Sequence, residues 1–150
     1  GADDYVTKPY RLRELVARAS AELGLGVGAA LRALQPRVVQ LLPLLSGQRL
    51  TSFFVDERGN VQVQAGGRLV PSLSLQPAER DVCYAVLKLG FAEQGLAAGK
   101  SVALLDDAFA SLPEGARRIL ARALKQVARG RQVVHGTSDP VFREAADHAG

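Results

Sequence analysis

Two adjacent carboxylates, Asp106 and Asp107, follow the apolar run Val102 to Leu105. The apolar run predicts a strand inside a sheet, and open α/β sheets bind their ligands at the carboxyl ends of strands. A first carboxylate at that place can hold Mg²⁺, directly or through water, and a second can orient or deprotonate an attacking water. The alternative is an acidic turn after a buried strand. Asp106 is therefore a candidate metal ligand and Asp107 a candidate catalytic residue.

A glycine-rich segment directly before this strand, Gly95 to Ser101, superficially matches a phosphate-binding loop. Such a loop reads Gly-x4-Gly-Lys-Ser/Thr, follows a strand and opens a helix. Here the glycine spacing is one residue short, and a helix precedes while a strand follows. We therefore reject this segment as a phosphate loop and interpret Lys100 as a loop residue.

The elements that must position the carboxylates follow one another from residue 77 as helix, strand, helix, strand and helix. Their predicted ranges are 77–92, 101–105, 114–128, 132–135 and 140–149. Fully apolar strands separated by helices predict an α/β fold with a mostly parallel sheet. The candidate core of this part is Val86, Leu87, Leu89, Val102, Leu104, Ile119, Leu124, Val133 and Val134.

The first half of the chain has a different pattern. Residues 50–55 and 60–64 predict a β-hairpin around a polar turn, and residues 68–70 could add a third strand. Apolar spacing predicts helices at 11–23 and 29–45, the second broken or kinked at its two prolines. Between these helices, the glycines at 24, 26 and 28 predict a linker.

Four segments in this order resemble the C-terminal half of an SMC/ABC-type ATPase head. Residues 102–107 are similar to the Walker B motif of that family, and residues 108–113 occupy the place of its D-loop. Residues 132–140 resemble the following strand and switch segment. Residues 75–81, Leu-Gln-Pro-Ala-Glu-Arg-Asp, resemble the signature motif, usually Leu-Ser-Gly-Gly-Glu-Arg-Asp. The resemblance covers about residues 29–150 and is closest to SMC-like heads, whose halves are split by a coiled coil.

The resemblance implies a head that binds ATP and Mg²⁺ and pairs with a second head, as a homodimer or with another chain. It places Asp106 on the metal, Asp107 in catalysis, and Gln76, Ala78 and Asp139 at nucleotide-contacting positions. No Walker A motif lies within the 150 residues. The resemblance therefore implies no ATP hydrolysis by this chain alone, although the complete protein could hydrolyse ATP.

Departures from the family pattern point to a degenerate head. Gln76 replaces the signature serine, and Pro77 and Ala78 replace its glycines. Proline has no N–H to donate, and alanine adds a Cβ where backbone must approach phosphate closely. Asp107 is one methylene shorter than the usual glutamate, and Asp139 stands where the family has its switch histidine.

The first 23 residues resemble the end of a response-regulator receiver domain, which has a flavodoxin-like fold. The match rests on Gly-Ala-Asp-Asp-Tyr-Val-Thr-Lys-Pro-Tyr and the helical pattern that follows. It implies that Lys8 pairs with a phosphoryl group, that Tyr5 is the switch aromatic, and that a histidine kinase is the partner of the complete receiver. The expected domains are thus a receiver end at 1–23, a linker at 24–28 and an ATPase lobe at 29–150.

The amino-acid composition indicates the cellular environment expected for the protein. The single cysteine, Cys83, fits a reducing cytoplasm, and no apolar run approaches the length of a membrane span. The sequence contains no methionine, so we interpret it as a processed product, an excised piece or a fragment of a longer reading frame. The net charge of +4 is concentrated between residues 117 and 131, where a basic helix is either a solvated face or a surface for DNA or an acidic partner.

Three functions remain open at this stage. The first is a signal-transduction regulator in which a phosphorelay receiver controls an SMC-like head. The second is a non-catalytic adaptor or dimerisation module whose ATPase-like lobe has lost turnover. The third is a fragment of a DNA-binding chromosome-maintenance ATPase, for which the basic helix is the evidence.

Overall fold

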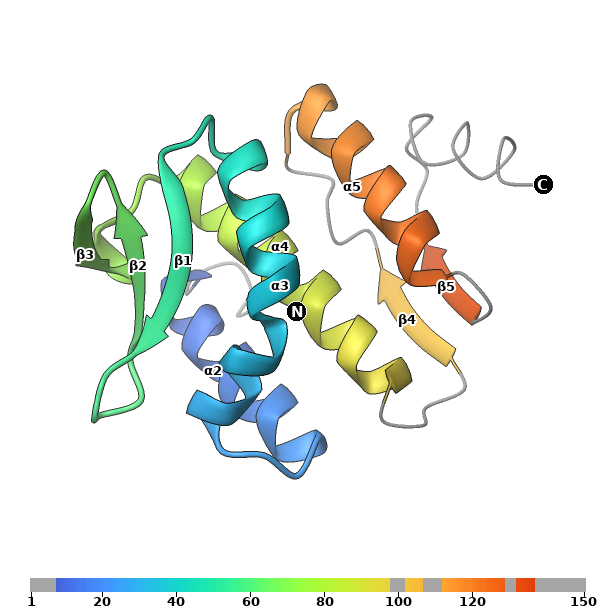
Figure 1. Cartoon of the computed structure of the whole chain (residues 1–150), viewed down its shortest axis with the longest axis horizontal. Coiled ribbons are helices and arrows are strands. Elements are labelled where there is room, and N and C mark those ends of the chain that lie inside the picture. Colours follow the sequence, from blue (N-terminus) through green and yellow to red (C-terminus); the bar gives the residue numbers. More distant parts are fainter. Residues whose placement is uncertain (1–7, 98–101, 107–111, 129–131, 137–150) are drawn as a thin grey trace. The chain divides into compact units, whose positions relative to one another are not determined.

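The computed structural model describes residues 8–97, 102–106, 112–128 and 132–136 of the chain. The chain is a mixed α/β protein that divides into two compact units, Gly1–Phe91 and Ala92–Gly150. The described residues of the first unit form two helices, a three-stranded sheet, a short 3-10 helix and the start of a long helix. These are α2 (Lys8–Glu22), α3 (Val27–Leu45), β1 (Leu50–Val55), β2 (Val61–Ala65), β3 (Arg68–Pro71), η1 (Ser72–Ser74) and α4 (Pro77–Ala97) (Figure 1).

The expected hairpin is confirmed, and residues 68–71 do add a third strand. The strands run antiparallel in the order β1-β2-β3, with Phe53 opposite Val63 and Val63 opposite Val70. On this face of the sheet Phe53 and Val63 are buried, whereas Phe54 on the opposite face is 45% exposed. The alternation of buried and exposed residues is what a sheet covered on one face requires.

An aspartate closes the turn between β1 and β2. Asp56 Oδ1 accepts hydrogen bonds from the backbone N–H groups of Arg58 and Asn60, each at 2.9 Å. Gly59 has a φ of +81°, a left-handed conformation that glycine adopts without steric cost. The polar turn predicted between the two strands therefore has a specific side-chain anchor.

Of the break or kink predicted at the two prolines, the break is wrong, because α3 runs as one helix from Val27 to Leu45 with Pro36 and Pro43 inside it. Proline removes a helical hydrogen bond, so a continuous helix needs compensation from packing. One face of α3 supplies it through six buried apolar residues: Ala30, Leu31, Leu34, Val38, Leu41 and Leu42. Ser46 is the C-cap of the helix, and its hydroxyl donates to Leu42 O at 2.7 Å and accepts the Leu50 N–H at 2.9 Å.

Helices α3 and α4 approach closely at a glycine. A Cβ built on Gly90 would lie 2.9 Å from Leu34 Cδ2, which is closer than a real Cβ contact. Both residues are buried, and their neighbours on α4 include the fully buried Cys83, Val86 and Leu87. Gly90 is thus a packing requirement of the first unit.

Helix α2 belongs to the first unit. It packs on α3 and η1, and it buries Leu12 and Val16 to 1% exposure. Its Arg13 Nη2 donates a 3.2 Å hydrogen bond to the carbonyl oxygen of Arg58 in the turn between β1 and β2. The connection to α3 is only residues 23–26, shorter than the linker expected at 24–28, and Gly24 has a φ of +71°.

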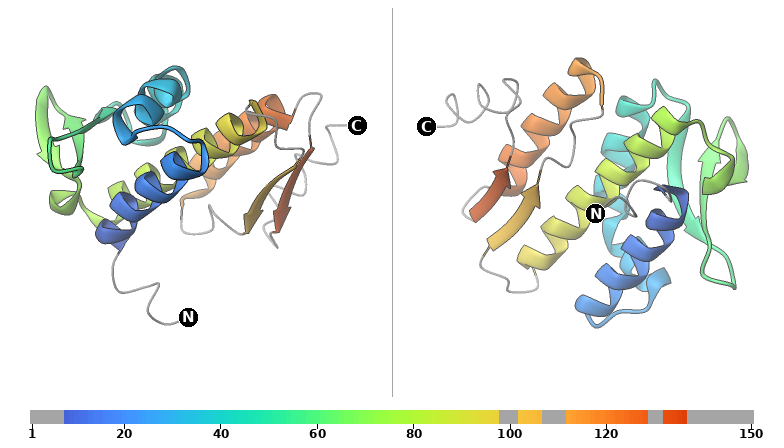
Figure 2. Two further views of the ribbon diagram at one scale, coloured as in Figure 1. Left: turned by 90° about the horizontal axis from the view of Figure 1, so that it is seen from below. Right: turned by 180° about the vertical axis from the view of Figure 1, so that it is seen from behind.

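The second unit contains the end of α4, β4 (Val102–Asp106), α5 (Glu114–Ala128) and β5 (Gln132–Gly136), shown from two further sides in Figure 2. Strands β4 and β5 are parallel, as predicted. Helix α5 has the predicted bounds and buries Leu120, Leu124 and Val127. Of the nine predicted core residues, Val86, Leu87, Leu89 and Leu124 are buried and Ile119 is only partly buried; the strand side chains lie outside the described ones.

Candidate functional site

The signature-like segment forms the start of α4. Pro77 is the first helical residue, a position where its missing N–H removes no helical hydrogen bond. Gln76 precedes it as the N-cap, and its carbonyl oxygen accepts the Arg80 N–H at 3.0 Å. Glu79 reaches back, and its Oε1 accepts the backbone N–H of Gln76 at 3.3 Å. This is the reciprocal half of a capping box, with glutamine in place of the usual serine or threonine.

The carboxylate of Glu79 also has a charged partner. The Nε of Arg49, in the connection between α3 and β1, donates to Glu79 Oε2 and forms an ion pair with it. The Arg49 side chain is 61% exposed, whereas that of Glu79 is 15% exposed. A negative charge is therefore already fixed at the N-terminus of α4, where the helix dipole favours it.

This arrangement offers a phosphate group fewer backbone donors than the usual signature motif does. A helix N-terminus binds anions through its free backbone N–H groups. Here the Gln76 N–H donates to Glu79 and Pro77 has no N–H. Ala78 is exposed, and its Cβ stands where the resembling family has none. The expected nucleotide contacts of Gln76 and Ala78 therefore stay predictions that the local hydrogen bonding does not favour.

The candidate metal ligand is placed by the backbone alone. Asp106 is the last residue of β4 and lies in register with Gly136 at the carboxyl end of β5, so both strands end at the same edge. Asp107 and Asp139 lie outside the described residues, as does Tyr5, and Lys8 is the first residue of α2. Within the part of the chain that the structure describes, no group of three or more His, Cys, Asp or Glu residues could hold a metal ion.

Three basic residues of α5 lie on its exposed side, whereas Arg117 is partly buried. Arg118, Arg122 and Lys125 are exposed, and Arg118 Nη2 forms an ion pair with Glu114 Oε1 at 2.8 Å. An i, i+4 pair of this kind on an exposed helix face contributes little to stability. No helix in the described ranges combines the length and apolarity that crossing a membrane requires.

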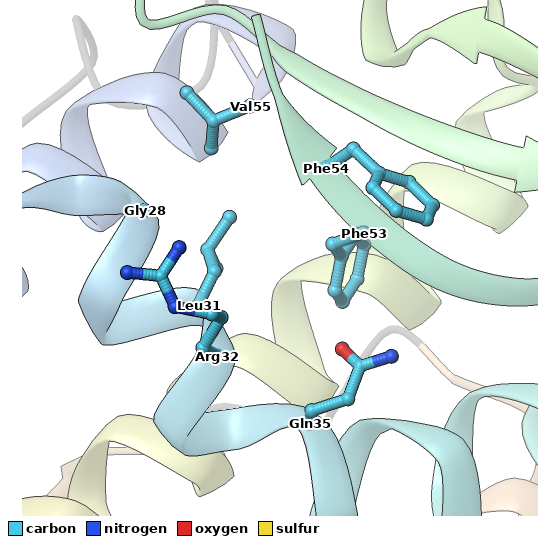
Figure 3. Close-up of a pocket in the computed structure, with 7 residues that line it drawn as sticks. All are labelled: Gly28, Leu31, Arg32, Gln35, Phe53, Phe54 and Val55. Atoms are coloured by element: carbon cyan, nitrogen blue, oxygen red, sulfur yellow. The ribbon is translucent and has the colours of Figure 1, made fainter.

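Sequence reasoning missed a pocket between α3 and β1. Its volume is ≈330 Å³, and its lining comes from one side of α3 and three consecutive residues of β1 (Figure 3). The lining residues are Gly28, Leu31, Arg32, Gln35, Phe53, Phe54 and Val55. The helical members follow the spacing i, i+3, i+4 and i+7, which is one face of a helix. That spacing was a readable signal, but the sequence did not show which strand would lie beside it.

Comparison with known proteins gives structural relatives only. No protein-family model matches the chain, and no curated protein does. Among solved structures, an SMC head bound to the C-winged helix domain of ScpA aligns with a TM-score of 0.59 at 12% identity, over 77% of this chain and 37% of that one. An SMC ATPase studied for ATP-driven dimerization and DNA-stimulated activation aligns with a TM-score of 0.57 at 16% identity, over 78% and 74%.

A third relative is the Smc head domain of Pyrococcus yayanosii with a coiled coil and joint. It aligns with a TM-score of 0.58 at 16% identity, over 78% of this chain and 24% of that one. The fold is SMC head-like. Identities this low establish the fold and no activity. The chain spans 37% of the SMC head chain described first, so the activities and partners of complete heads are not established for it.

Proposed function

We propose that this chain is the signature-bearing part of an SMC-type head that has lost its phosphate contact and acts as a nucleotide-independent assembly module. The observation that carries the proposal is the start of α4. There the Glu79 carboxylate accepts a hydrogen bond from the Gln76 N–H and forms an ion pair with Arg49. Pro77 has no backbone N–H to donate. A site built to receive the phosphates of a second head would leave these donors free.

Exposed apolar residues support the assembly role. Leu69 on β3 and Leu73 in η1 are 51% and 68% exposed, and Val39 and Leu44 on α3 are 50% and 53% exposed. Exposed apolar side chains mark surfaces for other proteins where they lie together as a patch, and Leu69 and Leu73 are close in sequence. The related heads are described as dimerising with ATP and as bound to ScpA, so a second head or another protein subunit is the class of partner proposed here.

A second candidate is the regulator in which a receiver controls the head. The resemblance of residues 1–23 to a receiver end remains its basis, and Lys8 and Tyr5 remain its predicted switch residues. The packing of Leu12 and Val16 within the first unit favours a different role for α2, as a structural part of the same compact body. We therefore place this candidate, and binding of DNA by α5, behind the assembly module.

ATP hydrolysis tests the nucleotide independence of the module, because the 150 residues contain no Walker A motif and any turnover would reveal a nucleotide site. Phosphate release is measured for the purified chain with Mg·ATP, beside Asp107→Asn and the matched control Asp56→Asn, which removes one carboxylate from the turn between β1 and β2. We expect all three to release phosphate at the rate of the protein-free buffer. Turnover by the wild type that Asp107→Asn abolishes and Asp56→Asn retains would refute the proposal.

A further inference from the structure

One segment of the second unit carries charge of a single sign. Between positions 115 and 138 the sequence has six basic residues and no acidic one. These basic residues are Arg117, Arg118, Arg122, Lys125, Arg129 and Arg131. The first four belong to α5, and the only acid of that helix is Glu114, at its start. Like charges gathered on one surface create a field that attracts partners of the opposite sign.

Three of these residues form a straight row along α5. Arg118, Arg122 and Lys125 are exposed, and intervals of four and then three residues keep side chains on one face of a helix. The row extends over roughly 10 Å of the helix axis, at about 1.5 Å per residue. Arg129 continues the same spacing in the sequence and lies outside the described residues. We call Arg118, Arg122 and Lys125 the basic row.

Little negative charge within the described chain offsets the basic row. Arg118 Nη2 pairs with Glu114 Oε1 at 2.8 Å, and its Nε donates to the same oxygen at 3.2 Å. The side chain of Glu114 is 62% exposed, so solvent screens this pair. Arg122 and Lys125 form no ion pair with any residue that the structure describes. Two cations of the row are therefore available to a partner, and the third is only partly neutralised.

The spacing of the row favours one kind of acidic partner. A second α-helix with carboxylates at intervals of four and three residues repeats the axial separations of the row, about 6 Å and 4.5 Å. Proteins that hold nucleic acids add hydroxyl or amide donors to their cations, or aromatic rings on which bases stack. Helix α5 contains no serine, threonine, asparagine or aromatic residue. The row thus matches an acidic helix better than a nucleic-acid strand.

We propose that the basic row docks an acidic α-helix of a partner protein, whose carboxylates lie on one face at intervals of four and three residues. Each carboxylate lies opposite one cation, as charged residues do along the flanks of a coiled coil. Exposed ion pairs contribute little singly, so the contact is weak, sensitive to salt and selective for the sign and spacing of the charges. The row belongs to the second unit and the signature-like start of α4 to the first, so this proposal and the proposed function fail separately.

A designed helical peptide tests the row on the 150-residue chain. The probe has about 18 residues, because shorter isolated helices are marginal in water. It carries glutamates at intervals of four, three and four in a background of alanine and glutamine. A control peptide has the same composition, with its glutamates spread around the helix. Amide chemical shifts of the ¹⁵N-labelled protein should show saturable binding of the first peptide to α5 and about fivefold weaker binding of the second. Rising salt should weaken both.

Charge reversal tests the contribution of the row itself. Arg122→Glu places a negative charge in the middle of the row and should lower the affinity for the acidic helix about fivefold. A peptide with lysine at the matching position should bind this variant better than it binds the wild type. Arg18→Glu, an exposed reversal on α2, should change neither affinity. Because Arg122 and Arg18 are both exposed, the two variants should keep the circular dichroism spectrum of the wild type.

Four results would overturn the proposal. They are no binding at millimolar peptide in low salt, equal binding of the two acidic peptides, shifts confined to the first unit, and an unchanged charge preference in Arg122→Glu. Tighter binding of a short DNA duplex that Arg122→Glu weakens would assign the row to nucleic-acid phosphates, and would equally refute an acidic partner helix.

Discussion

Arg49 and Glu79 form an ion pair that ties the connection before β1 to the first turn of α4. The two residues are 30 positions apart in the sequence, and Glu79 also accepts the Gln76 N–H. The Glu79 carboxylate thus caps the start of α4 and also links it to the connection that leads into β1. The segment that resembles an ATPase signature therefore helps to hold the start of α4 against the connection that precedes β1.

Removing this carboxylate should destabilise the first unit. Glu79→Ala loses the cap hydrogen bond and the ion pair, and we expect the free energy of unfolding to fall by about 1 kcal/mol. Glu79→Gln keeps an acceptor for the Gln76 N–H and should lose less. Arg49 is mostly exposed, so Arg49→Ala should cost no more than Glu79→Gln. Urea unfolding measures the free energy of unfolding of all three variants. Equal stability of Glu79→Ala and the wild type would contradict the stabilising role of this carboxylate.

The contact between Gly90 and Leu34 predicts opposite effects at two helical glycines. Gly90→Ala places a Cβ 2.9 Å from Leu34 Cδ2 and should lower the free energy of unfolding by about 1–3 kcal/mol. Gly115→Ala on α5 meets no atom within 4 Å and should raise it by about 0.5–1 kcal/mol. Leu34→Val should recover part of the loss in a Gly90→Ala background. Thermal denaturation compares the stability of these variants. Stabilisation by Gly90→Ala would show that α3 and α4 are not packed this closely.

Acid should weaken the turn between β1 and β2. The hydrogen bond from the backbone N–H of Asn60 lowers the pKa of Asp56 below its ordinary value of 3.8. Partial desolvation opposes this shift, whereas the Asn60 side chain and Arg58 add to it. Because the folded pKa is lowered, this stabilisation is present above pH 3.8 and is lost as the pH falls through the folded pKa. Asp56→Asn keeps the acceptor and should lack this part of the pH dependence. Melting curves between pH 5 and pH 2 test it, and parallel curves for the two proteins would count against it.

The single cysteine should be unreactive in the folded chain. Burial, with the negative charge of Glu79, raises the pKa of the Cys83 thiol to about 12. The thiolate is the reactive form, and Cys83 is fully buried, so alkylation needs local opening. At pH 8 we expect iodoacetamide to label native Cys83 more than about a hundredfold slower than the same chain in denaturant. Comparable rates would mean that the helix containing Cys83 is not packed as described.

Much of this fold was predictable because its elements carry local signals. The hairpin follows from alternation around Asp56 and Gly59, and α5 has the predicted bounds because its apolar spacing is regular. The helix at 29–45 was predicted to be broken or kinked because Pro36 and Pro43 weaken a helix locally. The compensation comes from residues distant in sequence, among them Gly90, and no local pattern reveals it.

The sequence of the signature-like segment was informative, whereas its surroundings could not be predicted. The sequence indicated that Gln76, Pro77 and Ala78 depart from phosphate-binding residues. It could not show that Glu79 takes the Gln76 N–H or that Arg49 approaches, because that contact depends on the turn after α3. The pocket beside β1 was missed for the same reason, since Arg32 and Phe53 meet only through the tertiary fold.

Self-association with and without nucleotide tests the central claim most directly. Sedimentation velocity of the purified chain, over a range of protein concentrations, gives its association constant in buffer and in Mg·ATP. A nucleotide-independent assembly module should associate in both conditions with the same constant. Association that appears or strengthens tenfold only with Mg·ATP, and that Asp107→Asn alters, would contradict the account, as would a chain that stays monomeric at every concentration.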